Sequence, residues 1–178
     1  SGYGQDGPYR DMKAYDLLIQ GEGGIIATTG YPDKPAKAGV AIADIASGMY
    51  AALGITLALF QREKTGRGQE VDISMFDSIL SWLGYFPHHY WHRGEEPGRA
   101  GMRHHYVTPY GPYLAGDGEY VNLVVATVRD WELFCQEVIE RPDLLEDDRF
   151  SSVEARRTNR SALEETIEDV LQQRKHDE

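Results

Sequence analysis

Residues 39–50 read GVAIADIASGMY, an apolar and small-residue run that contains a single charge, Asp44. The spacing of the apolar residues is typical of a helix, and Asp44 falls near its start. An acid in a first helical turn is common, because it accepts hydrogen bonds from free backbone N–H groups and faces the positive end of the helix dipole. The residues three and four positions away are all small or short, which leaves space beside the carboxylate. These residues are Val40, Ala41, Ser47 and Gly48. The stretch therefore allows either a simple helix cap or a carboxylate that a substrate can reach.

The first half of the chain alternates helix and strand patterns. A helical pattern runs from Tyr15 to about Gly24, and a longer one with a wide apolar stripe runs over residues 40–64. Residues 70–74 then alternate like a short strand, and residues 76–91 return to the helical period. Helix, strand and helix in this order predict an α/β layer with a largely parallel sheet.

A stretch rich in Gly, Pro and charge begins at residue 93. We interpret residues 93–106 as a linker between a first region, residues 1–92, and a second region, residues 107–178.

The second region has the pattern of a small α+β domain. Residues 110–114 and 120–126 flank an AGDGE turn, which is a β-hairpin signature. Helical patterns follow at about 129–139 and 161–173, and residues 161–164 match a capping box.

Composition limits the partners of the chain. The 178 residues include 18 basic and 29 acidic side chains, for a net charge of −11, so nucleic acid is not expected as a partner. A single phosphorylated ligand stays compatible, because a few local cations and backbone N–H groups can hold it. No stretch approaches the roughly 20 uninterrupted apolar residues of a membrane span, so a membrane is not expected either.

Cys135 is the only cysteine, which excludes an internal disulfide and favours a reducing cytoplasm. Its apolar neighbours place it on a packed helix face rather than in a nucleophilic role.

Several short motifs follow one another along the chain. They are SGYG at 1–4, GPY at 7–9, YD at 15–16, TG at 29–30, GVAIAD at 39–44, TGRGQ at 65–69, VDIS at 71–74, RH at 103–104, PYG at 109–111 and GDG at 116–118. Together they resemble the class III CoA-transferase family, which includes formyl-CoA transferase, carnitine CoA-transferase and α-methylacyl-CoA racemase. The resemblance covers the whole chain, and residues 39–74 are its specific part. It implies that residues 1–92 belong to a Rossmann-like large domain that binds CoA, that the chain is the middle of a longer protein, and that the protein forms an interlocked homodimer.

By this resemblance Asp44 matches the catalytic aspartate of the family. A carboxylate can attack an acyl thioester, because the CoA thiolate is a good leaving group and the anhydride that forms stays activated. In the transferases this aspartate carries first the acyl group and then CoA, and in the racemases it helps to exchange the proton α to the thioester.

The segment Met12, Lys13, Ala14 and Tyr15 matches the stretch that contacts CoA in formyl-CoA transferase. Lys13 is suited to pair with a CoA phosphate, and Tyr15 to shape the pocket near the thioester. The racemases have His at the position of Tyr15, where it exchanges a proton, and a phenol is a poor exchanger at neutral pH. A solvated lysine and a packed aromatic are the ordinary alternatives for these two side chains.

The leading hypothesis is therefore an enzyme that moves CoA between an acyl-CoA and a carboxylic acid through Asp44, with no permanently bound cofactor. A 2-methylacyl-CoA racemase and a non-catalytic fragment of the same fold are the alternatives. The glycine-run lid of formyl-CoA transferase is missing here, which argues against formate and oxalate as acyl partners. No metal site is expected, because the adjacent His104 and His105 would point in different directions.

Overall fold

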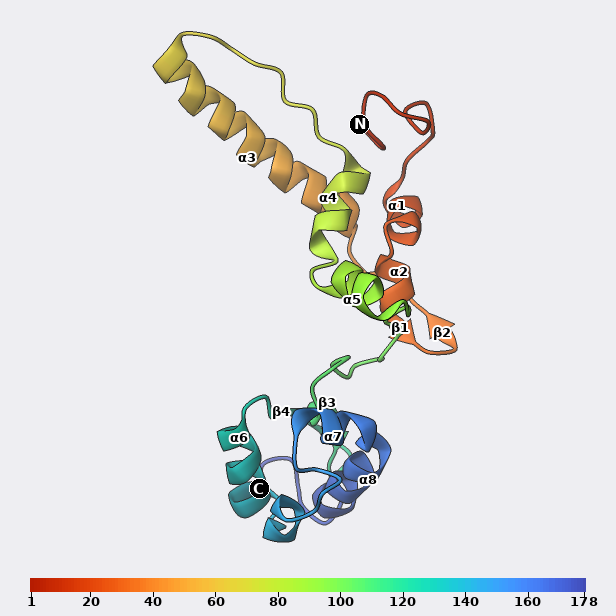
Figure 1. The fold of residues 1–178 in the computed structure, drawn as a ribbon, viewed down its shortest axis with the longest axis vertical. Coiled ribbons are helices and arrows are strands. Elements are labelled where there is room, and N and C mark those ends of the chain that lie inside the picture. Colours follow the sequence, from red (N-terminus) through yellow and green to blue (C-terminus); the bar gives the residue numbers. More distant parts are fainter. The chain divides into compact units, whose positions relative to one another are not determined.

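A computed structural model describes residues 1–178, and the chain divides into two compact units, Ser1–Gly101 and Met102–Glu178 (Figure 1). The division between Gly101 and Met102 falls within the stretch 93–106.

The first unit is mainly helical. Its elements are α1 (Asp16–Glu22), α2 (Ile25–Thr28), β1 (Gly30–Tyr31), β2 (Lys34–Pro35), α3 (Ile42–Thr65), α4 (Met75–Trp82) and α5 (Phe86–Arg93). The long helix α3 packs against both α1 and α4 (Figure 1). It begins close to the predicted residue, and it ends where Gly66 takes a φ of 70° and donates its N–H to Arg62 O, since glycine adopts this left-handed conformation without strain.

The core of this unit is small and lies at the start of α3. Ile19, Ala43 and Ile79 are fully buried there. Partly buried residues that pack against them are Tyr3, Ala14, Ile25, Ile42, Met75 and Phe76. Because Ala43 is in this core, its packing fixes the backbone next to the exposed Asp44.

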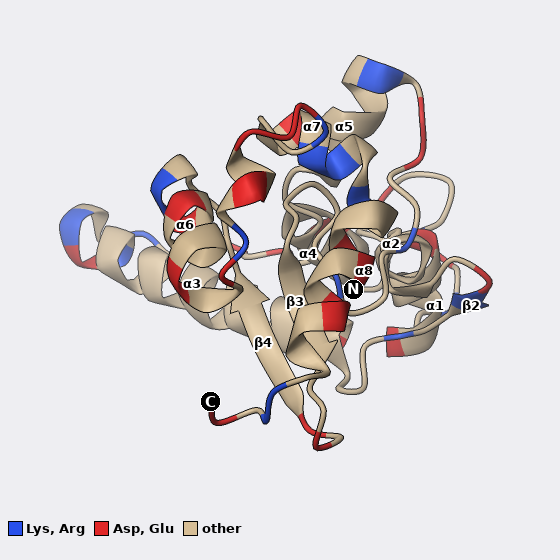
Figure 2. Ribbon diagram, turned by 90° about the horizontal axis from the view of Figure 1, so that it is seen from below, with Lys and Arg blue, Asp and Glu red and all other residues tan.

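Most of the large apolar side chains of α3 are not covered by any other part of residues 1–178. Figure 2 shows that the middle of the helix carries no charged residue, whereas Arg62, Glu63 and Lys64 lie at its end. The exposed apolar side chains are Ile45, Met49, Leu53, Ile55, Leu57, Leu59 and Phe60. By length and composition alone, this 24-residue helix could cross a bilayer, although one such helix is weak support for a membrane span. Ser47 and Thr56 interrupt its apolar residues, so the length of uninterrupted apolar runs does not identify this helix.

The parallel sheet predicted for the first unit is not formed by residues 1–178. The only strands of this unit are the two-residue antiparallel pair β1 and β2, and residues 70–74 have no regular secondary structure. A strand needs a neighbouring backbone, and within this segment the Ile73 carbonyl accepts only from the Ser1 end of the chain, whose ammonium group donates at 2.8 Å. The residues directly after the segment also bond to the start of the chain. The Met75 N–H donates to Ser1 O at 3.1 Å, and the Phe76 N–H donates to Gly2 O at 3.0 Å.

The helix predicted over residues 76–91 is present but broken. α4 ends at Trp82 and α5 begins at Phe86, with Gly84 between them at a φ of 59°. Pro87 suits the first turn of α5, where its missing N–H is not needed.

The second unit is a hairpin covered by helices. Its elements are β3 (Tyr110–Leu114), β4 (Tyr120–Val124), α6 (Val128–Leu133), the π-helix η1 (Phe134–Val138), the 3₁₀-helix η2 (Pro142–Leu145), α7 (Val153–Thr158) and α8 (Arg160–Leu171). The strands pair antiparallel from Tyr110 with Val124 to Leu114 with Tyr120, so the predicted hairpin is confirmed. Cys135 is fully buried in the core, and burial raises the pKa of its thiol to about 12, as expected of a packed residue.

The predicted capping box at 161–164 is wrong. Asn159 both ends α7 and begins α8, so Ser161 already lies inside α8. The capping box of this unit is instead at α6, where Thr127 Oγ1 accepts from the Asp130 N–H at 3.1 Å and Asp130 Oδ2 accepts from the Thr127 N–H at 2.9 Å.

Candidate functional site

Asp44 lies in the first turn of α3 and is exposed. Its carboxylate takes part in none of the hydrogen bonds or ion pairs of the chain, so it is not a satisfied helix cap. It borders a surface cavity of about 410 Å³. The cavity is lined by Ser1, Asp44, Ser47, Gly48, Ala51, Ile73 and Met75. The space that the small residues predicted beside the carboxylate is therefore present.

The small residues on α3 keep this cavity open. A Cβ added at Gly48 would meet no heavy atom within 4 Å. The Ser47 hydroxyl turns back along the helix and donates to the Ala43 carbonyl. Neither residue competes with a ligand for the carboxylate of Asp44.

The segment Met12–Tyr15 reaches the start of α3 through the residue that follows it. Asp16 Oδ1 accepts a hydrogen bond from the Ala43 N–H at 2.9 Å. Tyr15 precedes Asp16 and Asp44 follows Ala43, so this bond joins the two predicted parts of the site. Asp16 is not among the residues predicted from the sequence; its signal is an acid directly after the matched segment and at the first position of a helix.

In the segment Met12–Tyr15, one side chain packs against the protein core and three are exposed. Ala14 packs against the core cluster, whereas Met12, Lys13 and Tyr15 are exposed. Tyr15 is 69% exposed, so it is not the packed aromatic that was the ordinary alternative. The segment thus offers one ammonium group, one phenol and one thioether to a ligand near the Asp44 turn.

The Arg-His motif of residues 103–104 has structural partners in the second unit. The Arg103 guanidinium lies 3.8 Å from the centre of the Tyr113 ring and forms ion pairs with Glu164 at 3.5 Å and Glu168 at 3.2 Å. His104 Nδ1 accepts from the backbone N–H groups of Tyr106 and Val107 at 3.1 and 3.0 Å. These contacts shape the loop before β3. Burial, followed by the nearby His105 and Arg160, lowers the pKa of His104.

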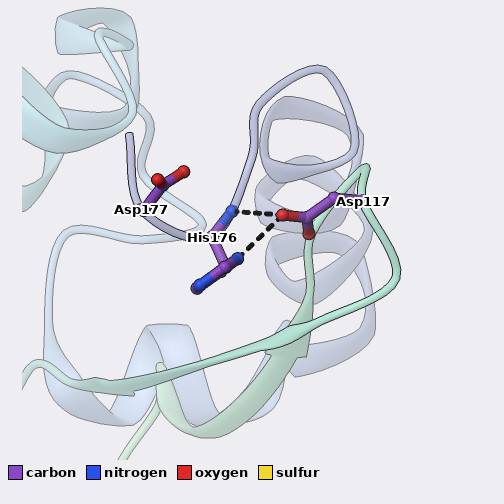
Figure 3. Close-up of side chains that lie close together, drawn as sticks. All are labelled: Asp117, His176 and Asp177. Carbon is purple, nitrogen blue, oxygen red and sulfur yellow. Dashed lines mark hydrogen bonds and ion pairs between the residues drawn. The ribbon is translucent and has the colours of Figure 1, made fainter.

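Three exposed side chains of the second unit offer possible metal ligands (Figure 3). Asp117 Oδ2 accepts from the His176 ring at 2.7 Å and from the His176 backbone N–H at 3.2 Å. One ligand atom from each of Asp117, His176 and Asp177 lies within 4.8 Å of the others. The hydrogen bond with Asp117 raises the pKa of His176, and the same bond lowers the pKa of Asp117 to about 2. The geometry is that of a surface ion pair between a hairpin turn and the segment after α8.

Comparison with known proteins matches the whole chain to one family. The model of CoA-transferase family III matches residues 1–178. The acetyl-CoA:oxalate CoA-transferase of Acetobacter aceti is 35% identical over 173 residues, which cover 96% of this chain and 44% of the relative. The succinyl-CoA:mesaconate CoA-transferase of Haloarcula hispanica is 37% identical over 159 residues, 88% of this chain and 39% of the relative. The chain thus spans less than half the length of these relatives.

Solved structures agree with this match. A CAIB/BAIF family protein from Brucella suis superposes with a TM-score of 0.78 at 36% identity, over 99% of this chain and 47% of that one. A hypothetical protein from Mycobacterium tuberculosis superposes with a TM-score of 0.82 at 25% identity, over 99% of this chain and 46% of that one. With a family model that matches every residue, relatives above 30% identity and a shared fold, the chain belongs to CoA-transferase family III.

Proposed function

We propose that the protein that contains this chain is an enzyme that transfers CoA from an acyl-CoA to a carboxylic acid, with Asp44 as the nucleophile. The observation that carries the proposal is the Asp44 carboxylate, which is exposed, free of protein partners and beside a cavity. The relatives named above and the succinate–glutarate CoA-transferase of Agrobacterium fabrum act on dicarboxylic acids by name. A short dicarboxylate is therefore the proposed class of acid. The similarity to an oxalate transferase weighs against the expectation, drawn from the missing glycine-run lid, that oxalate is not an acyl partner.

The proposed reaction conserves atoms and charge at every step. An Asp44 oxygen attacks the thioester carbonyl, the C–S bond breaks, and an aspartyl anhydride and the CoA thiolate form. The thiolate attacks the aspartyl carbonyl of the anhydride, which releases the first acid as a carboxylate and leaves an aspartyl-CoA thioester. The second acid attacks this thioester and expels the thiolate, which then takes the new acyl group and frees Asp44. No step requires a proton donor or a permanently bound cofactor.

Met12, Lys13, Ala14 and Tyr15 are the proposed contacts to CoA. Lys13 is exposed and can pair with a phosphate oxygen of the ligand. Tyr15 precedes the residue that binds the first turn of α3, so its phenol is suited to line the thioester end of the site.

A 2-methylacyl-CoA racemase is the second candidate function. It needs a partner for Asp44 that exchanges protons near neutral pH, and Tyr15 occupies the position where the resemblance implies that partner. A non-catalytic role of the fold is the third, and it predicts that the complete protein transfers no CoA and forms no adduct on Asp44.

The surroundings of the site are also part of the proposal. We expect residues 1–92 to belong to a Rossmann-like domain whose sheet is supplied by chain outside residues 1–178, since residues 70–74 lack strand neighbours. The exposed apolar side of α3 supports burial against a second copy in a homodimer. A reducing cytoplasm fits the single, buried cysteine.

The test replaces Asp44 in the complete protein. Asp44→Ala should abolish CoA transfer and leave the fold unchanged by circular dichroism, because the small neighbours keep the helix packed. Hydroxylamine added during turnover should convert Asp44, and no other residue, to a hydroxamate that mass spectrometry detects. The matched control is Asp77→Ala, which removes a first-turn acid from α4 and should leave transfer intact. Full transfer by the Asp44 variant, or an adduct on another residue, would contradict the proposal.

A further inference from the structure

The first turn of α3 has no cap of its own. Ala41 is the residue before the helix and offers no side-chain acceptor. The Ile42 N–H turns back to Val40 O at 2.9 Å, and the Ala43 N–H donates to Asp16 Oδ1 at 2.9 Å. The acceptor that caps α3 therefore comes from another helix.

A buried glutamine holds this acceptor in place. Gln20 is fully buried, and its Nε2 donates to Asp16 Oδ2 at 2.7 Å. Its Oε1 accepts from the Ala38 N–H at 2.8 Å. Both oxygens of Asp16 and both ends of the Gln20 amide are thus used, and they connect α1, the loop before α3 and the first turn of α3.

We propose that Asp16 is the positioning residue for Asp44, oriented in turn by Gln20. This inference rests on the proposed function. A carboxylate beside the positive end of α3 satisfies an N–H group that has no partner within the helix. Because the acceptor belongs to α1, the bond also keeps the Met12–Tyr15 segment in register with the turn that carries Asp44.

Asp16 also explains why Asp44 is free. An acid in a first helical turn ordinarily competes for the exposed N–H groups there. With the Ala43 N–H occupied by Asp16, the Asp44 carboxylate is left for the thioester. Removal of Asp16 should loosen the turn and let Asp44 bind the vacated backbone group.

The test compares four variants of the complete protein with the unaltered enzyme. Asp16→Ala should lower kcat roughly 100-fold, the effect of a misplaced reacting group, while KM for the acyl-CoA changes little. Amide hydrogen exchange of residues 42–45, followed by mass spectrometry, should be roughly 10-fold faster in this variant. Asp130→Ala is the matched control, because it removes a first-turn acid of α6 and should change neither quantity.

Paired substitutions separate positioning from general damage. Asp16→Asn alone places two donors against each other at Gln20, and Gln20→Glu alone places two carboxylates together. The double variant Asp16→Asn/Gln20→Glu restores a donor and an acceptor on both sides, so it should recover most of the kcat and the slow exchange. A mere loss of packing would not be rescued in this way.

Two results would overturn the inference: unchanged kcat in Asp16→Ala, or unchanged exchange of residues 42–45. If the unaltered protein itself shows neither CoA transfer nor an Asp44 adduct, the proposed function fails instead. The exchange rates would then still decide whether Asp16 holds the turn.

Discussion

Two glycines on α3 should respond in opposite ways to the same substitution. Gly48 and Gly54 both lie inside the helix, where replacement of Gly by Ala stabilises by about 0.5–1 kcal/mol through backbone entropy. At Gly48 the added Cβ meets no atom within 4 Å, so the full gain is expected. At Gly54 it would lie 2.7 Å from Val71 Cγ1, and overpacking of this kind costs typically about 1–3 kcal/mol.

The net change is thus about +0.5 to +1 kcal/mol for Gly48→Ala, and between about zero and −2.5 kcal/mol for Gly54→Ala. Amide exchange of α3 peptides in the complete protein measures the difference, since about 1 kcal/mol changes a rate constant governed by local opening roughly fivefold. Gly48→Ala should slow the exchange, and Gly54→Ala should speed it or leave it unchanged. Equal stabilisation by both variants would refute the packing of α3 against residues 71–73.

Three further predictions address the second unit, the reaction and the assembly. Asp117→Asn should return the pKa of His176 toward 6.5, as measured by NMR titration, because the Asp117 hydrogen bond raises it. The Asp117–His176 pair should stabilise the folded state at pH values between the ordinary pKa of Asp, 3.8, and that of His, 6.5. This stabilisation should be lost as the pH rises through the raised pKa of His176, and also as the pH falls toward the lowered pKa of Asp117 at about 2. In D₂O the complete protein should exchange the α proton of a 2-methylacyl-CoA far more slowly than it transfers CoA, since Tyr15 is a poor proton exchanger. Comparable rates of exchange and transfer would favour the racemase hypothesis instead. Residues 1–178 expressed alone should be inactive and should associate in light scattering, because the apolar face of α3 is uncovered; a monodisperse monomer that binds CoA would contradict this domain anatomy.

The sequence by itself determined the features that depend on near neighbours. The helical period and the Gly66 ending placed α3, and the AGDGE turn between alternating strands placed the hairpin β3–β4. The space beside Asp44 was also predictable, because residues three and four apart share one face of a helix. The roles of Met12, Lys13, Ala14 and Tyr15 stay predictions, although the exposure of Tyr15 excludes a packed aromatic.

Only the tertiary structure decided the features that depend on distant partners. Residues 70–74 have a strand pattern, yet a strand forms only where a neighbouring strand supplies hydrogen bonds, and no strand lies beside this segment, whose Ile73 carbonyl accepts from the Ser1 ammonium group. The capping box at 161–164 failed because the end of α7 determines where α8 begins. Asp16 reaches the Ala43 N–H from 27 residues away, so no local pattern could identify it as the cap of α3. Hydrogen bonds of this kind depend on how helices pack, and that information is not contained in the spacing of residues along a single helix.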